Sequence, residues 1–247
     1  NGERVIVACG SATSVGGFAA VYKAPATSTG DWVKIGEWKG SDIGTTSFGG
    51  TAAISDDGNT VAVQNGNKYT ISFYRYQSDN NWLHIGTTAT LTPSWYVGMA
   101  GSSGIFFNKD ATVLLVSTAG PVDRILVIRY QSDGNWTKDN FDPANIPPGL
   151  EYAGANQLTH YGPQVSINNA GTRIISGALT NYGDAPNQGL VSIYDYNSNT
   201  STWVRTTTYD ASDIGEKEEK GYFGAATAMN GNGDKILISK RGPQSRG

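Results

Sequence analysis

The sequence predicts an all-β chain, a β-propeller or a propeller segment of four-stranded antiparallel units, with about four repeats plus a partial one. Three observations predict it. One order of apolar strands and polar turns recurs along the 247 residues, the turns carry Asp-Gly, Asn-Gly or Ala-Gly pairs, and helical periodicity never lasts beyond about two turns. Chains of this length commonly form one large all-β domain.

Each repeat is read as an apolar strand, a polar turn, a second apolar strand, and a third strand that ends in Tyr, followed by a polar turn and Trp. In the clearest copy these are 48–55, 56–59, 60–63, 69–76 and 78–82. The run Val61-Ala62-Val63 is apolar at every position, which is typical of a strand buried on both faces.

The chain divides into five approximate units within one repeat domain. They are 1–46, which lacks the first strand, then 47–96, 97–160, 161–221, and 222–247, which holds only the first two strands. Sheets left open at such ends expose apolar faces and unpaired edges. We therefore expect further repeats, or other chains of an assembly, to pack against the ends.

Composition excludes several partners. The formal net charge of −3 and the pI near 5.4 provide no basic surface for nucleic acid. No segment reaches the ~20 apolar residues of a membrane span. The single cysteine, Cys9, follows the apolar run Val5-Ile6-Val7-Ala8, so we expect a buried and unreactive thiol.

Two segments resemble the FG-GAP type of propeller repeat found in integrin α-subunits and in many secreted or surface proteins. They are Ser47-Phe48-Gly49-Gly50 with the strand and turn that follow it, and Gly221-Tyr222-Phe223-Gly224 with 229–239. The resemblance implies a secreted or surface-exposed propeller. Calcium-binding members carry spaced carboxylates in the first hairpin turn, and this chain lacks them, so we expect no metal and no cofactor.

The sequence offers no catalytic constellation. His84 and His160 lie in different units, and neither a Gly-x-Ser-x-Gly nucleophile turn nor a phosphate-binding loop occurs. We therefore expect no catalytic residues, and a non-enzymatic binding or structural assembly module at a surface. A carbohydrate-binding lectin is the alternative, and a propeller enzyme that processes glycans is the third hypothesis.

Aromatic residues and sequons supply the remaining candidates. Trp32, Trp82, Trp136 and Trp203 share one phase of the repeat and are expected to pack between neighbouring units. Trp95 and Tyr96 lie outside that phase and are the candidates for contact with a protein or glycan. Asn135 and Asn199 begin Asn-x-Thr/Ser triplets in equivalent turns and are candidate glycosylation sites.

Overall fold

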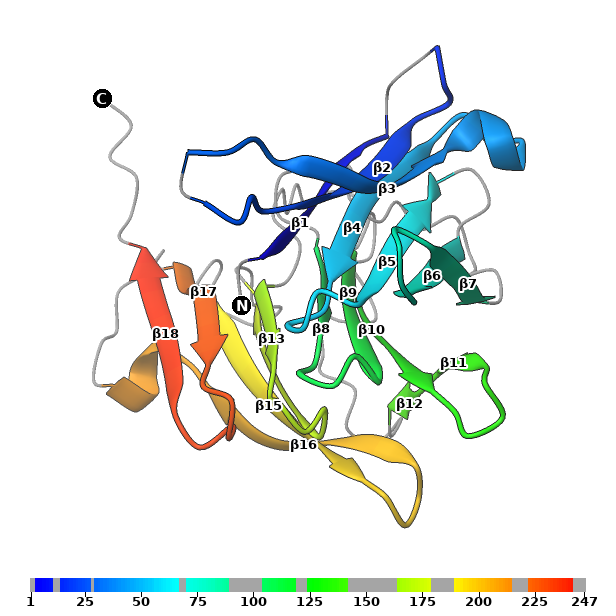
Figure 1. Cartoon of the computed structure of the whole chain (residues 1–247). Helices are drawn as coiled ribbons and strands as arrows, with labels where there is room; N and C mark the ends of the chain where they lie inside the picture. The colour runs from blue at the N-terminus through cyan, green and yellow to red at the C-terminus, as the bar shows by residue number, and fades with distance from the viewer. Residues whose placement is uncertain are drawn as a thin grey trace. The chain divides into compact units, whose positions relative to one another are not determined.

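The structure is a computed structural model, which describes residues 3–10, 14–27, 29–66, 70–88, 104–118, 124–141, 164–178, 189–214 and 222–241. Every described element is a β-strand or a short 3-10 turn (Figure 1). The all-β expectation is confirmed. The described chain forms two compact units, and the boundary between them falls inside strands β9 and β10.

The first unit contains two antiparallel sheets. Sheet I has the order β1-β2-β3, and sheet II has the order β4-β5-β6-β7. Their strands are β1 (Arg4–Cys9), β2 (Phe18–Lys23), β3 (Val33–Lys39), β4 (Phe48–Ile54), β5 (Thr60–Asn65), β6 (Thr70–Tyr76) and β7 (Trp82–Thr87). The 3-10 turn η1 (Gly40–Ile43) joins them. Sheet I thus has three strands.

Sheet III has the order β11-β10-β9-β8. Its strands are β8 (Ile105–Phe107), β9 (Val113–Thr118), β10 (Arg124–Tyr130) and β11 (Trp136–Lys138). β9 begins after the polar turn at 108–111, and β11 begins after the polar turn at 132–135.

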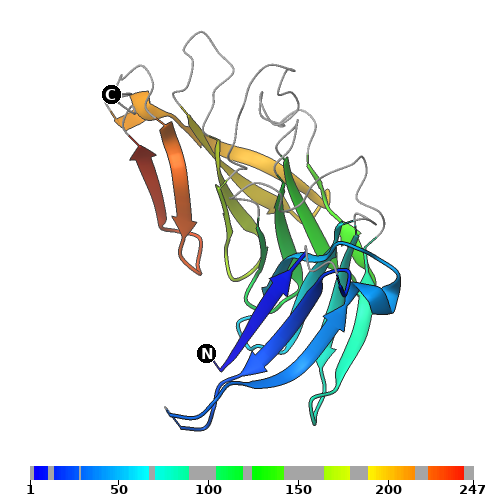
Figure 2. The same cartoon turned by 90° about the horizontal axis from the view of Figure 1, so that it is seen from above.

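The second unit contains sheets IV and V. Sheet IV has the order β12-β16-β15-β14-β13, and sheet V is the antiparallel pair β17-β18, drawn in orange and red in Figure 2. Their strands are β12 (Asn140–Phe141), β13 (Gln164–Ile167), β14 (Arg173–Ala178), β15 (Leu190–Asn197), β16 (Thr202–Tyr209), β17 (Tyr222–Met229) and β18 (Ile236–Arg241). The turn η4 (Ala211–Ile214) follows β16. The fifth strand, β12, pairs parallel with β16 and was not expected.

One turn conformation connects the first two strands of sheets II to V. Its third or fourth residue adopts a left-handed backbone, with φ between 53° and 77°, and donates its N–H to the carbonyl three residues earlier. The residues are Gly58, Ala111, Gly171 and Gly233. Glycine adopts this conformation without steric cost, which explains the Gly pairs of the repeat. Because the same hydrogen bond occurs in each turn, the residues of sheets II to V can be compared position by position.

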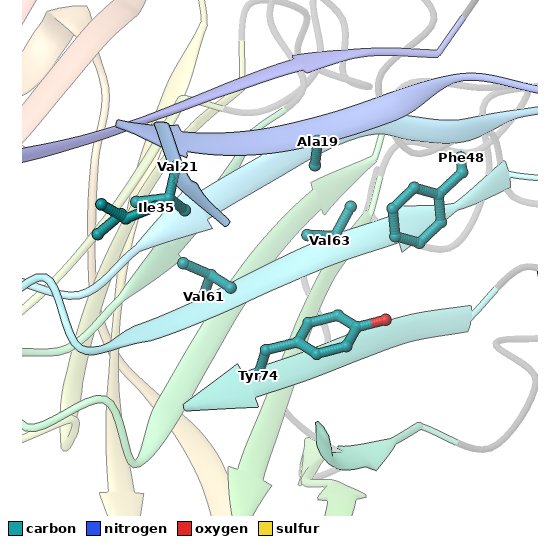
Figure 3. Close-up of a cluster of buried hydrophobic side chains, with 7 residues drawn as sticks. All are labelled: Ala19, Val21, Ile35, Phe48, Val61, Val63 and Tyr74. Carbon is teal, nitrogen blue, oxygen red and sulfur yellow. The ribbon is translucent and has the colours of Figure 1, made fainter. Parts of the chain in front are cut away.

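The core consists of inner strands whose faces meet between adjacent sheets. Ala19, Val21 and Ile35 of sheet I pack on Phe48, Val61, Val63 and Tyr74 of sheet II (Figure 3). In the second unit, Ile175 and Val191 of sheet IV pack on Phe223, Ile236 and Ile238 of sheet V. Removal of this apolar surface from water is the main force that holds the sheets together.

Tryptophans at the start of the fourth strands dock on the preceding sheet. Trp82 lies against Gly36, and its Nε1 donates to the Ile35 carbonyl at 2.9 Å. Trp136 stacks on Phe73 with ring centroids 3.8 Å apart and lies against Gly86. The expected packing between neighbouring sheets is therefore observed for both tryptophans.

Trp203 is fully buried in the second unit, where its Nε1 donates to Asp139 Oδ2 at 3.1 Å. Trp32 departs from the expectation, because it is exposed. Trp32 lies immediately before β3, whose first residue, Val33, is exposed as well.

Candidate functional site

The aromatic and histidine candidates give no site. Trp95, Tyr96 and His160 lie outside the described residues. His84 is exposed on β7, where its Nε2 lies 2.9 Å from Thr87 Oγ1. Within the described part of the chain, no three His, Cys, Asp or Glu side chains are close enough to hold a metal ion.

Asn135 and Asn199 both lie on exposed turns between the third and fourth strands of their sheets. Their backbone N–H groups donate to the side chains two residues earlier, to Asp133 at 2.9 Å and to Asn197 at 3.0 Å. The two turns share this hydrogen bond but differ in length, because Tyr130 pairs with Trp136 and Tyr196 pairs with Trp203. Glycosylation of these asparagines stays a prediction.

Cys9 is half-buried and not fully buried as its sequence context suggested. It is the last residue of β1 and pairs with Phe18 at the first residue of β2. The apolar run before it alternates between two faces, so only some of its members lie in the core.

The candidate site is a polar cluster at the end of β5. Gln64 and Asn65 follow the apolar run Val61-Ala62-Val63, and both are buried. Thr45 Oγ1 donates to Asn65 Oδ1 at 2.8 Å, which satisfies that carboxamide oxygen. The Oε1 atom of Gln64 accepts no hydrogen bond from the described residues. A buried acceptor without a donor costs about 1–3 kcal/mol.

Gly50 of β4 lies next to Gln64, and Gly10, which follows β1, lies next to Gly50. A β-carbon on Gly50 would lie 2.8 Å from Gln64 Oε1, and a β-carbon on Gly10 would lie 2.8 Å from the Gly50 Cα. Gly50 itself is exposed. The unsatisfied acceptor thus lies beside a residue that has no side chain.

The chemistry of this cluster is neutral hydrogen bonding. A carboxamide accepts through its oxygen and donates through its nitrogen, and the Thr45 hydroxyl does both. None of Gln64, Asn65 and Thr45 can act as a general base near pH 7. The groups of the cluster form neutral hydrogen bonds, and proton transfer needs another residue.

Gln64 was not among the sequence-based candidates. The signal that could have indicated it is the polar pair that ends an otherwise apolar strand. The equivalent residues of β14 are Gly177 and Ala178, so the pair is not demanded by the repeat.

No family model matches the chain, and no curated protein matches it. Solved structures do. A protein of Bacteroides uniformis, named as a candidate 6-phosphogluconolactonase, is 13% identical with a TM-score of 0.52, and the match covers 96% of this chain and 61% of that one. Sqt1 of Saccharomyces cerevisiae is 8% identical with a TM-score of 0.55, covering 96% and 53%.

The periplasmic gluconolactonase of Pseudomonas aeruginosa is 15% identical, with a TM-score of 0.38 and coverage of 96% and 76%. The chain spans about half to three fifths of the first three structures it matches, at 48%, 54% and 61% of their lengths. Its neighbours are β-propellers. The chain has a β-propeller fold, in agreement with its four-stranded antiparallel sheets.

These comparisons correct the expectation of a non-enzymatic module, because a protein named as a lactonase shares this arrangement of sheets. The expectation was wrong because it relied on the absence of catalytic motifs in the sequence. A site built from loops and strand ends of several sheets gathers residues that are distant in sequence, and no local motif records it. None of the helices in the described ranges is long and apolar enough to span a membrane.

Proposed function

We propose that this chain forms part of a propeller enzyme that acts on a carbohydrate-derived substrate, with a sugar lactone as the first class to test. The observation that carries the proposal is the likeness to the structure named as a candidate 6-phosphogluconolactonase, which extends over 96% of this chain. A fold alone hosts many functions, so the polar cluster at Gln64 supplies the second support.

Gln64 is the residue proposed to orient the substrate. Its free Oε1 can accept a hydrogen bond from a sugar hydroxyl, which would remove the cost of the unsatisfied acceptor. Hydrolysis of a lactone further requires a base to activate water and donors to stabilise the oxyanion. The cluster of Gln64, Asn65 and Thr45 holds no cation, so it favours a neutral lactone over a phosphorylated one.

The test is a titrimetric assay of glucono-1,5-lactone hydrolysis by the whole chain, with the spontaneous rate subtracted. We expect a rate above the spontaneous one, and a Gln64→Met variant that raises KM at least tenfold. Gln77→Met is the matched control, because Gln77 is exposed on the turn after β6, and it should leave the rate unchanged.

Two results would contradict the proposal. Hydrolysis indistinguishable from the spontaneous rate, together with binding of the sugar in calorimetry, would favour the lectin hypothesis. If the chain neither hydrolyses the lactone nor binds the sugar, the whole carbohydrate class is excluded.

We also infer that the repeat is of the FG-GAP type. Its two Phe-Gly pairs make the same contact: the Phe48 carbonyl abuts Gly17 of sheet I, and the Phe223 carbonyl abuts Gly189 of sheet IV. Gly49 and Gly224 follow with φ of 79° and 78°. A crystal structure in which these two contacts differ would remove this support.

A further inference from the structure

The two turns that carry an Asn-x-Thr/Ser triplet differ in how far the fold uses the three residues. The first triplet, Asn135-Trp136-Thr137, runs from its turn into β11. The second, Asn199-Thr200-Ser201, lies wholly in the turn between β15 and β16. An enzyme that attaches a sugar to such a triplet has to reach both the asparagine carboxamide and the hydroxyl two residues later.

The fold engages every residue of the first triplet. Asn135 Nδ2 donates to Asp133 Oδ2 at 3.0 Å, and the Thr137 hydroxyl accepts a hydrogen bond from Gln131 Nε2 at 2.8 Å. Trp136 between them is buried and stacks on an aromatic ring of the preceding sheet. An enzyme that draws this triplet into its active site therefore has to break both hydrogen bonds and expose the indole ring to water.

The second triplet keeps its side chains at the surface. Asn199, Thr200 and Ser201 are all exposed, and none of them belongs to a strand. The Asn199 backbone N–H donates to Asn197 Oδ1 at 3.0 Å, whereas no described residue accepts a hydrogen bond from Asn199 Nδ2. The carboxamide and the Ser201 hydroxyl can therefore be reached without loss of packing, and a glycan on Asn199 would extend into solvent.

We propose that Asn199 is an attachment site for an N-linked oligosaccharide, and that the fold of sheet III withholds Asn135 from the same modification. The donor is an oligosaccharide whose C1 atom is linked to a lipid diphosphate. Asn199 Nδ2 bonds to C1, the bond from C1 to the diphosphate oxygen breaks, and one amide proton passes to a base of the transferase. The lipid diphosphate leaves with the electron pair of the broken bond, so the transfer needs neither an oxidant nor a reductant.

Secretion of the whole chain from a eukaryotic cell that glycosylates its secreted proteins tests the proposal. Intact mass before and after enzymatic removal of N-glycans counts the glycans, and peptide mass spectrometry measures the occupancy of each asparagine. We expect occupancy at Asn199 to be at least about fivefold that at Asn135, because only the second triplet is accessible in the fold. Asn199→Gln should remove most of the glycan, whereas the matched variant Asn135→Gln should leave the mass of the glycan unchanged.

A second pair of variants separates the triplet from the turn that holds it. Ser201→Ala keeps Asn199 in place but removes the hydroxyl that the triplet requires, so it should abolish the modification. Ser198→Ala is the control, because Ser198 is exposed in the same turn and lies outside the triplet. Equal melting temperatures of the two secreted variants exclude a loss of folding as the cause.

Two results overturn the proposal. One is a secreted chain without a glycan at Asn199. The other is occupancy at Asn135 that equals or exceeds occupancy at Asn199, because the hydrogen bonds of Asn135 and Thr137 and the burial of Trp136 would then not restrict the modification.

Discussion

Arg4 and Arg173 occupy the same position in two sheets and make the same contact with the next one. Arg4 Nη1 donates to the Gly58 carbonyl at 3.0 Å, and Arg173 Nη1 donates to the Gly233 carbonyl, also at 3.0 Å. Both carbonyls belong to the left-handed residue of the hairpin turn. In both places an arginine side chain connects adjacent sheets by donating to a backbone carbonyl. Because the acceptor is a backbone group, the hydrogen bond depends on the conformation of the turn and not on its side chains.

The ion pair of Arg173 and Asp195 predicts a pH dependence of stability. Hydrogen bonds from Arg173 at 2.6 and 2.9 Å hold the pKa of the Asp195 carboxyl below its usual range. A depressed folded-state pKa gives stability that is present above the unfolded pKa of about 3.9 and is lost as the pH falls through the folded value. Both side chains are about one-third exposed, so the contribution is at most about 1 kcal/mol.

Asp195→Asn should therefore lower the free energy of unfolding at pH 7, and its deficit should be smaller at pH 3, which lies below the unfolded pKa of about 3.9. Urea unfolding at the two pH values measures the difference. Asp31→Asn, at an exposed position, serves as the control and should match wild type at both. A deficit of Asp195→Asn that is as large at pH 3 as at pH 7 would contradict the assignment.

At the scale of elements, the glycines of the fourth strands decide how closely sheets approach. Gly36 lies opposite Val21 and Gly86 lies opposite Phe73, each next to a register shift, and each faces a tryptophan of the next sheet. The irregularity in the strand and the missing side chain together make room for the indole ring.

Gly86→Ala tests this docking. Its φ is 140°, and a β-carbon would lie 3.1 Å from Trp136 Cδ1, so we expect a loss of about 2–3 kcal/mol from strain and overpacking. Gly44→Ala is the control: its φ is 67° with no atom within 4 Å of a β-carbon, and it should cost only about 1 kcal/mol. Equal melting temperatures for the two variants would show that Trp136 does not depend on Gly86.

Strand order and most strand positions could be predicted from the sequence because apolar runs and Gly-containing turns act locally. Other features could not. The parallel pairing of Asn140 and Phe141 with β16 depends on contact with a distant segment. The tripeptide Ser-Asp-Ile occurs at 41–43 and 212–214, but only the structure shows that both copies form a 3-10 turn between two sheets.

At the scale of the whole molecule, the candidate site was less predictable than the fold. Gln64 reads as one more residue of a strand until the structure shows that its oxygen lies beneath Gly50 without a donor. The exposure of Trp32 likewise depends on the arrangement of sheets, because its sequence context matches that of Trp82 and Trp136. The sequence pattern identifies the tryptophan that can pack on a neighbouring sheet, and only the fold shows whether it does so.

The central claim is that sheets II, III and IV are propeller units whose second strands, β5, β9 and β14, are buried. Native-state hydrogen exchange, read by mass spectrometry along the whole chain, tests it most directly. The account predicts the slowest exchange in β5, β9 and β14, whose described side chains are largely buried, and faster exchange in β7 and β16. Exchange in β5, β9 and β14 as fast as in the fourth strands of the same sheets would contradict it.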